Sequence, residues 1–184
     1  MNPVIMRKTL FLALAAALVL SACTGVDPTR MLVPHPAVDR PATVDPATAL
    51  LLVNAFRQGK GLPALTLDPK LTAIAASHAR AMAAADKLEH VLPGEGSFSA
   101  RLAAGGYDAL TAAENIGMGY HNINEAFSGW RQSPHHRDNM LRKGVTQMGI
   151  AVAYSQSSKF RDYWAMVLAA PATDKPGGPA ASAR

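Results

Sequence analysis

Residues 147–169 read QMGIAVAYSQSSKFRDYWAMVLA, and this stretch decides the fold. Its two halves, 147–154 and 161–169, are rich in Val, Met and aromatic residues, and the polar, turn-like residues 155–158 separate them. This composition predicts two β-strands joined as a hairpin. Apolar residues occupy odd and even positions in both halves, so both faces of the predicted strands are apolar.

A sheet with two apolar faces must be covered on both sides, and the segments before the hairpin supply helices for this purpose. The dipeptides Asp45-Pro46 and Asp68-Pro69 each place a capping side chain before a proline, which is typical of a helix start. The predicted helices run from Pro46 to a stop at Gly59 and Gly61, from Pro69 to Lys87, from Ser97 to Ala104, and from the capping residue Asn124 through Trp130. The sequence therefore predicts an α+β fold, a three-layer α-β-α sandwich with a small, largely antiparallel sheet.

The start of the chain has the layout of a secretory signal. Two basic residues precede an apolar run from Leu10 to Leu20, and small residues then lead to Cys23. The run is too short to span the hydrocarbon core of about 30 Å, which needs about 20 apolar residues. Residues 20–23, Leu-Ser-Ala-Cys, resemble the bacterial lipobox, in which the cysteine is acylated and becomes the new N-terminus. The alternative is an ordinary signal peptide with a cysteine in its cleavage region.

Four segments are predicted. Residues 1–22 form the lipoprotein signal peptide, 23–44 a proline-rich tether, 45–170 the folded domain, and 171–184 a disordered tail rich in Pro and Gly. Cys23 is the single cysteine, so the domain depends on a packed core rather than on disulfide bonds. The net charge of +5 is spread without a run of Lys or Arg, which does not indicate a nucleic-acid partner.

Polar residues between the second helix and the hairpin lie in short motifs. The motifs are Leu88-Glu89-His90, Ala113-Glu114-Asn115-Ile116-Gly117, Glu125 five residues before Trp130, SPHHRDN over 133–139, Gln147-Met148-Gly149-Ile150 and Tyr163-Trp164. In this order, and over Leu51 to Ala169, the chain resembles the CAP superfamily. This superfamily, also called SCP-like, includes cysteine-rich secretory proteins, venom antigen five and plant pathogenesis-related proteins.

The resemblance implies a shallow cleft in which His90, Glu114, Glu125 and His136 converge as the family's His-Glu-Glu-His tetrad. In several members the two histidines bind a divalent cation, often zinc. Neutral imidazole is a suitable zinc ligand, and the carboxylates can orient the rings or hold bound water. Two protein ligands would make an open, weak site, because a closed structural zinc site needs four ligands.

Each tetrad residue also has another interpretation. His90 can cap the carbonyl groups at the end of the second helix, Glu114 can face water at a sheet edge, and Glu125 lies in the first turn of a helix, where the helix dipole favours negative charge. His135 and His136 are adjacent, so only one can point into a given cleft. His136 fits the family pattern because Met140 follows it by four residues, and His135 is the second candidate.

The remaining prominent side chains are assigned structural roles. The sequence predicts His78 as a core histidine, Trp130 and Trp164 as packing residues, and Asn54 and Arg57 as polar braces of the fold. In addition, Val91 follows His90 where many relatives carry a serine, which makes a serine-type hydrolase mechanism less attractive.

Three functional hypotheses follow. The favoured one is a cell-envelope binding module, in which the cleft and an adjacent apolar groove hold a lipid, a peptide or an envelope partner. The alternatives are a metal-assisted, peptidase-like hydrolase with Glu114 or Glu125 as the general base, and a purely structural module. Catalytic zinc usually has three protein ligands, which disfavours the hydrolase. Thr24 follows Cys23, and by the sorting rule of bacteria with two membranes this favours the outer membrane.

Overall fold

The computed structural model of the protein describes residues 40–174. The predicted signal peptide, Cys23, most of the tether and the tail after Asp174 lie outside the described residues. The elements are α1 (Pro46–Gln58), β1 (Thr66–Leu67), α2 (Pro69–Ala85), α3 (Phe98–Ala104), β2 (Ala109–Met118), α4 (Ile123–Gln132), α5 (Pro134–Met140), β3 (Gln147–Tyr154), β4 (Asp162–Pro171) and a final 3-10 turn, η2 (Ala172–Asp174).

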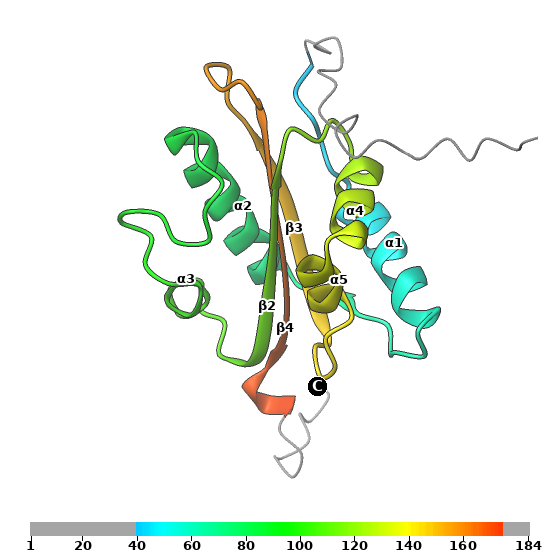
Figure 1. Ribbon diagram of the computed structural model, residues 1–184. Coiled ribbons are helices and arrows are strands. Elements are labelled where there is room, and N and C mark those ends of the chain that lie inside the picture. The colour runs from blue at the N-terminus through cyan, green and yellow to red at the C-terminus, as the bar shows by residue number, and fades with distance from the viewer. Residues whose placement is uncertain (1–39, 175–184) are drawn as a thin grey trace, which may run out of the picture. The chain divides into compact units, whose positions relative to one another are not determined.

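The four strands form one sheet in the order β1-β3-β4-β2. The pairs β3–β4 and β2–β4 are antiparallel, whereas the short β1 pairs with β3 in parallel. Helices α2 and α3 cover one face of the sheet, and α1, α4 and α5 cover the other face (Figure 1). The prediction of a three-layer α-β-α sandwich with a largely antiparallel sheet is therefore confirmed, and β2 is an edge strand.

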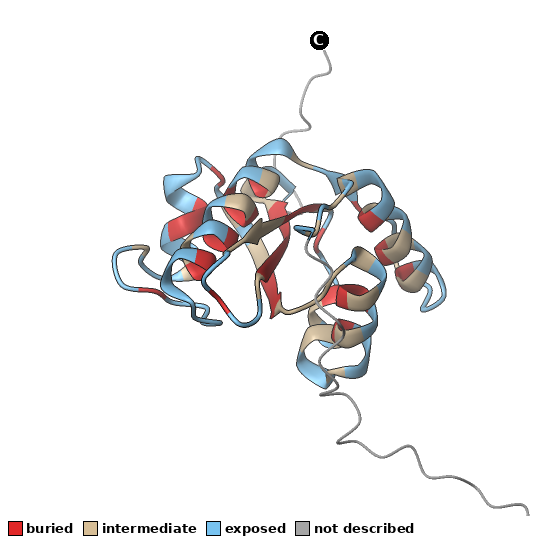
Figure 2. Ribbon diagram, turned by 90° about the horizontal axis from the view of Figure 1, so that it is seen from above, coloured by how far each residue is buried: buried red, intermediate tan, exposed pale blue. Residues whose placement is uncertain are grey.

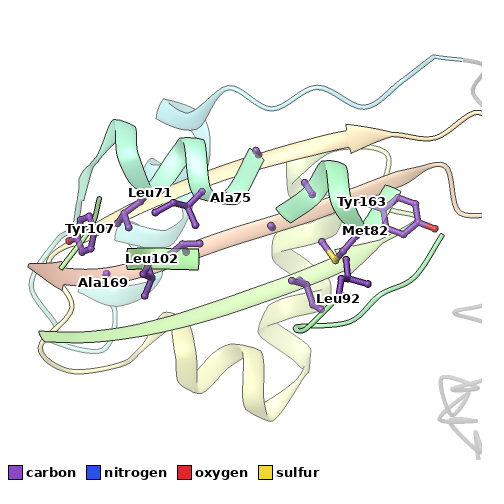
Figure 3. Close-up of a cluster of buried hydrophobic side chains, with 14 of the residues drawn as sticks. Leu71, Ala75, Met82, Leu92, Leu102, Tyr107, Tyr163 and Ala169 are labelled. Atoms are coloured by element: carbon purple, nitrogen blue, oxygen red, sulfur yellow. The ribbon is translucent and has the colours of Figure 1, made fainter. Parts of the chain in front are cut away.

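Strand β4 shows why two helical layers are needed. Its odd-numbered residues from Tyr163 to Ala169 belong to the core under α2 and α3, and its even-numbered residues from Trp164 to Leu168 belong to the core under α1 and α4. Figure 3 shows the first core, in which Leu71, Ala75 and Met82 of α2 lie over the sheet. Buried residues lie in the sheet and on the inner faces of the helices (Figure 2). The two-sided apolar pattern of the sequence thus has a direct structural cause.

The predicted helix starts are correct with one exception. The side chains of Asp45, Asp68 and Ser97 each accept a hydrogen bond from the first turn of the helix that follows. The fourth helix is capped by Asn122 and not by Asn124, because the Asn122 side chain accepts from the backbone N–H of Glu125. Helix α2 ends at Ala85, two residues before the predicted end, because the next residue adopts the left-handed conformation with φ 50°.

Chain segments on both sides of the predicted domain are also ordered. The backbone N–H of Ala42, within the predicted tether, donates to Oδ1 of Asp162 at 2.9 Å. At the other end, β4 extends to Pro171 and η2 continues to Asp174. The described structure therefore extends a few residues beyond 45–170 in both directions.

The residues predicted to brace the fold do so. The side chain of Asn54 donates to and accepts from the backbone of Leu65. The buried guanidinium of Arg57 donates to the carbonyl groups of Pro63, Met140, Arg142 and Val145. Trp130 and Trp164 are buried, and each indole N–H donates to a backbone carbonyl group.

Candidate functional site

The candidate site is built around two consecutive residues of the edge strand β2, Glu114 and Asn115. Successive side chains of a strand point to opposite faces of the sheet. Accordingly, Glu114 contacts groups from the layer of α2 and α3, and Asn115 contacts groups from α5. The Glu-Asn motif thus connects both helical layers to one edge of the sheet.

Glu114 is buried among three basic side chains. Its Oε1 lies 2.8 Å from Nδ1 of His90 and 3.8 Å from Nε2 of His78, and its Oε2 accepts from Nη2 of Arg101 at 2.5 Å. Burial raises the pKa of Glu114, but the hydrogen bonds from His90 and Arg101 and the charge of His78 outweigh burial and leave the pKa below 4.5. Glu114 is therefore an ionised carboxylate at neutral pH, and the alternative interpretation of a water-facing edge residue is wrong.

His90 lies in the loop between α2 and α3 and is fixed at two points. Its Nδ1 contacts Glu114, and its backbone carbonyl accepts from Nη1 of Arg101 at 2.7 Å. A neutral ring that donates from Nδ1 to a carboxylate keeps the lone pair on Nε2. The His90 side chain is 53% exposed. The geometry therefore leaves Nε2 as the atom available to a ligand.

His136 lies in α5, on the other side of the edge strand. Its backbone carbonyl accepts from the side chain of Asn115 at 2.9 Å, and Asn139 donates to both Asn115 Oδ1 and the carbonyl group of Glu114 at 3.0 Å. The pKa of His136 is lowered by burial and then by the charges of His90 and His135. His136 is half-buried, whereas His135 is exposed. His136 is therefore tied to the edge strand through its backbone, and His90 is among the groups that lower its pKa.

Glu125 is engaged at the start of its own helix. Its Oε2 accepts from the backbone N–H of His121 at 2.9 Å, and its Oε1 accepts from the side chain of Asn122 at 2.8 Å. Together with the bond from the Glu125 N–H to Asn122, this forms a reciprocal cap of α4. These contacts fit the interpretation of Glu125 as a first-turn acid, and none of them joins it to His90, Glu114 or His136.

The described side chains offer a metal ion only a small number of ligands. A carboxylate-bound histidine with a free Nε2 is the arrangement typical of metal-ligating imidazole. Within residues 40–174, however, no group of three or more His, Cys, Asp or Glu side chains is placed to hold an ion. The described residues therefore offer an ion at most two of these side chains, with the other positions left to water or to a bound molecule.

Sequence reasoning missed three contributors to the site. Arg101, on α3, forms the buried ion pair with Glu114. His78 is fully buried, as predicted, but its Nδ1 contacts Oε2 of Glu95 at 2.8 Å and it approaches Glu114. Asn139 supports Asn115. The signal for Arg101 was a basic residue inside a short apolar helix, where a charged side chain needs a buried partner.

A separate hollow lies near the start of β2. It has a volume of about 310 Å³ and is lined by Asp68, Lys70, Gly106, Tyr107, Asp108, Gln147, Pro171, Ala172 and Thr173. None of these residues belongs to the predicted tetrad. The hollow is therefore distinct from the candidate site.

Comparisons with known proteins agree with the motif order. A family model described as the cysteine-rich secretory protein family, CAP, matches residues 50–168. The uncharacterized protein YkwD of Bacillus subtilis is 32% identical over 106 residues, which cover 58% of this chain and 41% of that protein. The match thus spans less than half the length of this relative.

Solved structures have the same fold. An extracellular protein containing an SCP domain, from Bacillus anthracis, aligns with a TM-score of 0.60 and 24% identity over 67% of this chain and 39% of its own. An outer surface protein of Borrelia burgdorferi aligns with a TM-score of 0.60 and 17% identity over 72% of this chain and 99% of its own. At this level of identity, the likeness concerns the fold alone. Among the helices of residues 40–174, none has the length and apolar character to cross a membrane.

Proposed function

The chain belongs to the cysteine-rich secretory protein (CAP) family, and from this premise we propose that it is an exported lipoprotein whose CAP domain is a cell-envelope binding module. His90 and His136 hold a divalent cation, zinc in the first instance, and the surface around them binds a lipid, peptide or envelope ligand. The observation that carries the proposal is the hydrogen bond between His90 Nδ1 and the buried Glu114 carboxylate.

This hydrogen bond supports metal binding because it prepares the ligand atom before the ion arrives. Glu114 is held by Arg101, so it cannot swing away from His90 without breaking a buried ion pair. The lowered pKa of His136 keeps that ring neutral near pH 7, which is the form that binds zinc. A bound cation would supply a positive centre for an electron-pair donor of the ligand, such as a carboxylate or phosphate oxygen.

A binding role fits better than hydrolysis. A general base needs a free carboxylate near the reacting proton. Both oxygens of Glu114 are engaged by basic side chains, its pKa is lowered, and both oxygens of Glu125 accept hydrogen bonds at the start of α4. Two histidines also fall short of the three protein ligands usual for catalytic zinc.

Zinc titration of the purified chain by calorimetry tests the metal site. We expect saturable binding of one ion, which the His90→Ala and His136→Ala variants both lose. His135→Ala is the matched control, because His135 is the exposed neighbour of His136 and should bind zinc like the wild type. Unchanged affinity in either of the first two variants would remove the metal from the proposal.

The orienting role of Glu114 has its own test. Glu114→Gln should weaken zinc affinity by about 10- to 100-fold, as is typical when the partner of a ligating histidine is lost. Circular dichroism must first show that this variant is folded. A folded Glu114→Gln chain with wild-type zinc affinity would show that the hydrogen bond does not prepare His90.

The ligand can be assigned with defined probes. Vesicles of bacterial phospholipid and a library of short peptides are offered to the chain with and without zinc. Saturable vesicle or peptide binding without turnover favours the module. Zinc-dependent peptide cleavage that disappears in Glu114→Gln would instead establish the hydrolase.

Membrane attachment is proposed through Cys23, from the resemblance of residues 20–23 to a lipobox. The outer membrane is the proposed destination, because Thr24 follows the cysteine. Labelling cells with radioactive palmitate should mark the wild type and not Cys23→Ser. Equal recovery of both proteins in the membrane fraction would contradict the anchor.

A further inference from the structure

A third histidine lies behind the candidate metal site, in addition to His90 and His136. His78, on α2, is fully buried, and its Nδ1 contacts Oε2 of Glu95 at 2.8 Å. Its Nε2 points into the interior, where it has no hydrogen-bond partner among the described residues and lies 3.8 Å from Oε1 of Glu114. The four side chains of Glu95, His78, Glu114 and His90 thus form a continuous series from the loop before α3 to the exposed ring of His90.

The free Nε2 requires a physical explanation, because a buried polar atom without a partner is unfavourable. If Nδ1 donates to Glu95 and the ring is neutral, Nε2 presents a lone pair to the negative oxygen of Glu114. That arrangement is repulsive. With a proton on Nε2 as well, the same geometry becomes attractive, since the N–H then faces a carboxylate at ion-pair distance.

The charges of the cluster agree with the doubly protonated ring. Two carboxylates, Glu95 and Glu114, then lie beside two cations, Arg101 and His78. A histidine buried only for packing would not need both of its nitrogens to face carboxylate oxygens.

We propose that His78, anchored by Glu95, carries a proton on each ring nitrogen and is a positioning residue that fixes the Glu114 carboxylate, and through it the Nδ1–H tautomer of His90. The consequence for metal binding rests on the proposed function, whereas the arrangement of protons belongs to the metal-free protein. The inference therefore assigns a role to two side chains outside the His-Glu-Glu-His tetrad.

Glu95→Gln is the decisive variant, and Glu89→Gln is its matched control. Both replace a carboxylate by an amide in the segment between α2 and α3. Glu89 is half-exposed and pairs with Lys87 at 3.9 Å, whereas Glu95 is 16% exposed and contacts His78. Because Glu95 lies at the surface end of the series, its replacement should leave the fold intact. His78→Asn serves as a second variant.

The experiment is ¹⁵N NMR of the histidine rings in the metal-free full chain near pH 7, which reports which nitrogens carry protons. In the wild type and in Glu89→Gln, we expect His78 to be protonated on both nitrogens and His90 on Nδ1 alone. In Glu95→Gln, His78 should lose one proton, and the His90 signal should become that of a mixture of tautomers. In His78→Asn, the His90 signal should change in the same way.

A neutral His78 ring in the wild type would overturn the inference, and so would an unchanged His90 signal in Glu95→Gln. Zinc titration adds a separate readout, in which Glu95→Gln should weaken affinity by about tenfold relative to Glu89→Gln. If the wild type does not bind zinc, the proposed function fails, but the ring signals still decide the positioning role. The two failures are therefore distinguishable.

Discussion

The buried ion pair between Arg101 and Glu114 gives the sharpest quantitative prediction. The two side chains are 6% and 2% exposed, so water screens their attraction very little. Removing one partner of such a pair leaves the other charge buried without compensation, which typically lowers stability by about 3–5 kcal/mol. Arg101→Met and Glu114→Gln preserve the approximate size of each side chain and test this effect separately.

The size of the expected loss follows from what each variant leaves behind. Each single variant retains one contact with His90. In Arg101→Met, the His90 ring still bonds to Glu114, and in Glu114→Gln, the Arg101 guanidinium still donates to the His90 carbonyl group. We therefore expect the lower end of the range, about 3 kcal/mol for each. The double variant leaves neither charge buried alone, so its loss should be about 3–4 kcal/mol rather than the sum of about 6 kcal/mol.

Urea denaturation of the wild type, both single variants and the double variant measures this coupling. The slopes of the four transitions must agree, so that differences in midpoint report stability. A coupling energy of about 2–3 kcal/mol is the expected result. If the losses of the single variants add within about 0.5 kcal/mol, the two side chains do not act as a pair, and the account of how Glu114 is held is wrong.

The pH dependence of folding stability gives an independent check on the direction in which the pKa of Glu114 is shifted. The pKa of Glu114 is lower in the folded chain than its ordinary value of 4.5, so the unfolded chain takes up a proton there first. The stability contributed by the ionised carboxylate is present above pH 4.5 and is lost as the pH falls through the lower, folded pKa. Glu114→Gln should therefore show a shallower loss of stability in acid than the wild type.

Three further predictions concern the fold and are measured by the same urea transitions. Gly149→Ala should lose about 3 kcal/mol or more, because a Cβ there would lie 2.1–2.2 Å from backbone atoms of α2, whereas Gly59→Ala, with its nearest neighbour at 3.5 Å, should match the wild type. Arg57→Met should lose about 3–5 kcal/mol, since buried carbonyl groups lose a charged donor, and a wild-type midpoint would contradict this bracing role. Burial raises the pKa of Asp162, so Asp162→Asn should be at least as stable as the wild type at neutral pH, because the Asn Oδ1 can still accept from Ala42. As the pH falls, the stability of the wild type should rise relative to that of the variant. A clear loss of stability in the variant at neutral pH would refute this.

The fold was predictable where the sequence repeats a physical pattern. The run of β4 that is apolar on both faces and the Asp-Pro starts of α1 and α2 each appear at their expected positions. Helix α5 was missed because a single residue of it, Met140, is buried, so no apolar period marks it. Strand β1 was missed because it has two residues, both exposed. Elements without a buried face leave no hydrophobic signal to detect.

The sequence named candidate members of the site, of which Glu125 makes its hydrogen bonds at the start of α4 rather than with the others among the described residues, but it did not reveal the contacts that hold them. Motif order identified His90, Glu114 and His136, and the structure joins the first two by a hydrogen bond and ties the backbone of His136 to Asn115, the residue after Glu114. The partners that hold them could not be read from the sequence, because Arg101 and Glu95 reach the site only once α3 packs beside α2. A charged residue in a short helix has many possible partners until the layers are assembled.

The order of residues in the Glu-Asn motif is a consequence of strand geometry at a sheet edge. His90 and His136 come from opposite layers of the sandwich, so they can meet only around the free edge of β2. Glu114 contacts His90 and Asn115 contacts the backbone of His136, because neighbouring side chains on a strand point to opposite faces. A shift of β2 by one residue against β4 would send the carboxylate to α5 and the amide to Arg101, leaving a buried cation without its anion. The register that pairs Glu114 with Val167 therefore protects the core and the site together, and mutations that loosen it should lower stability and, under the proposed function, zinc affinity in parallel.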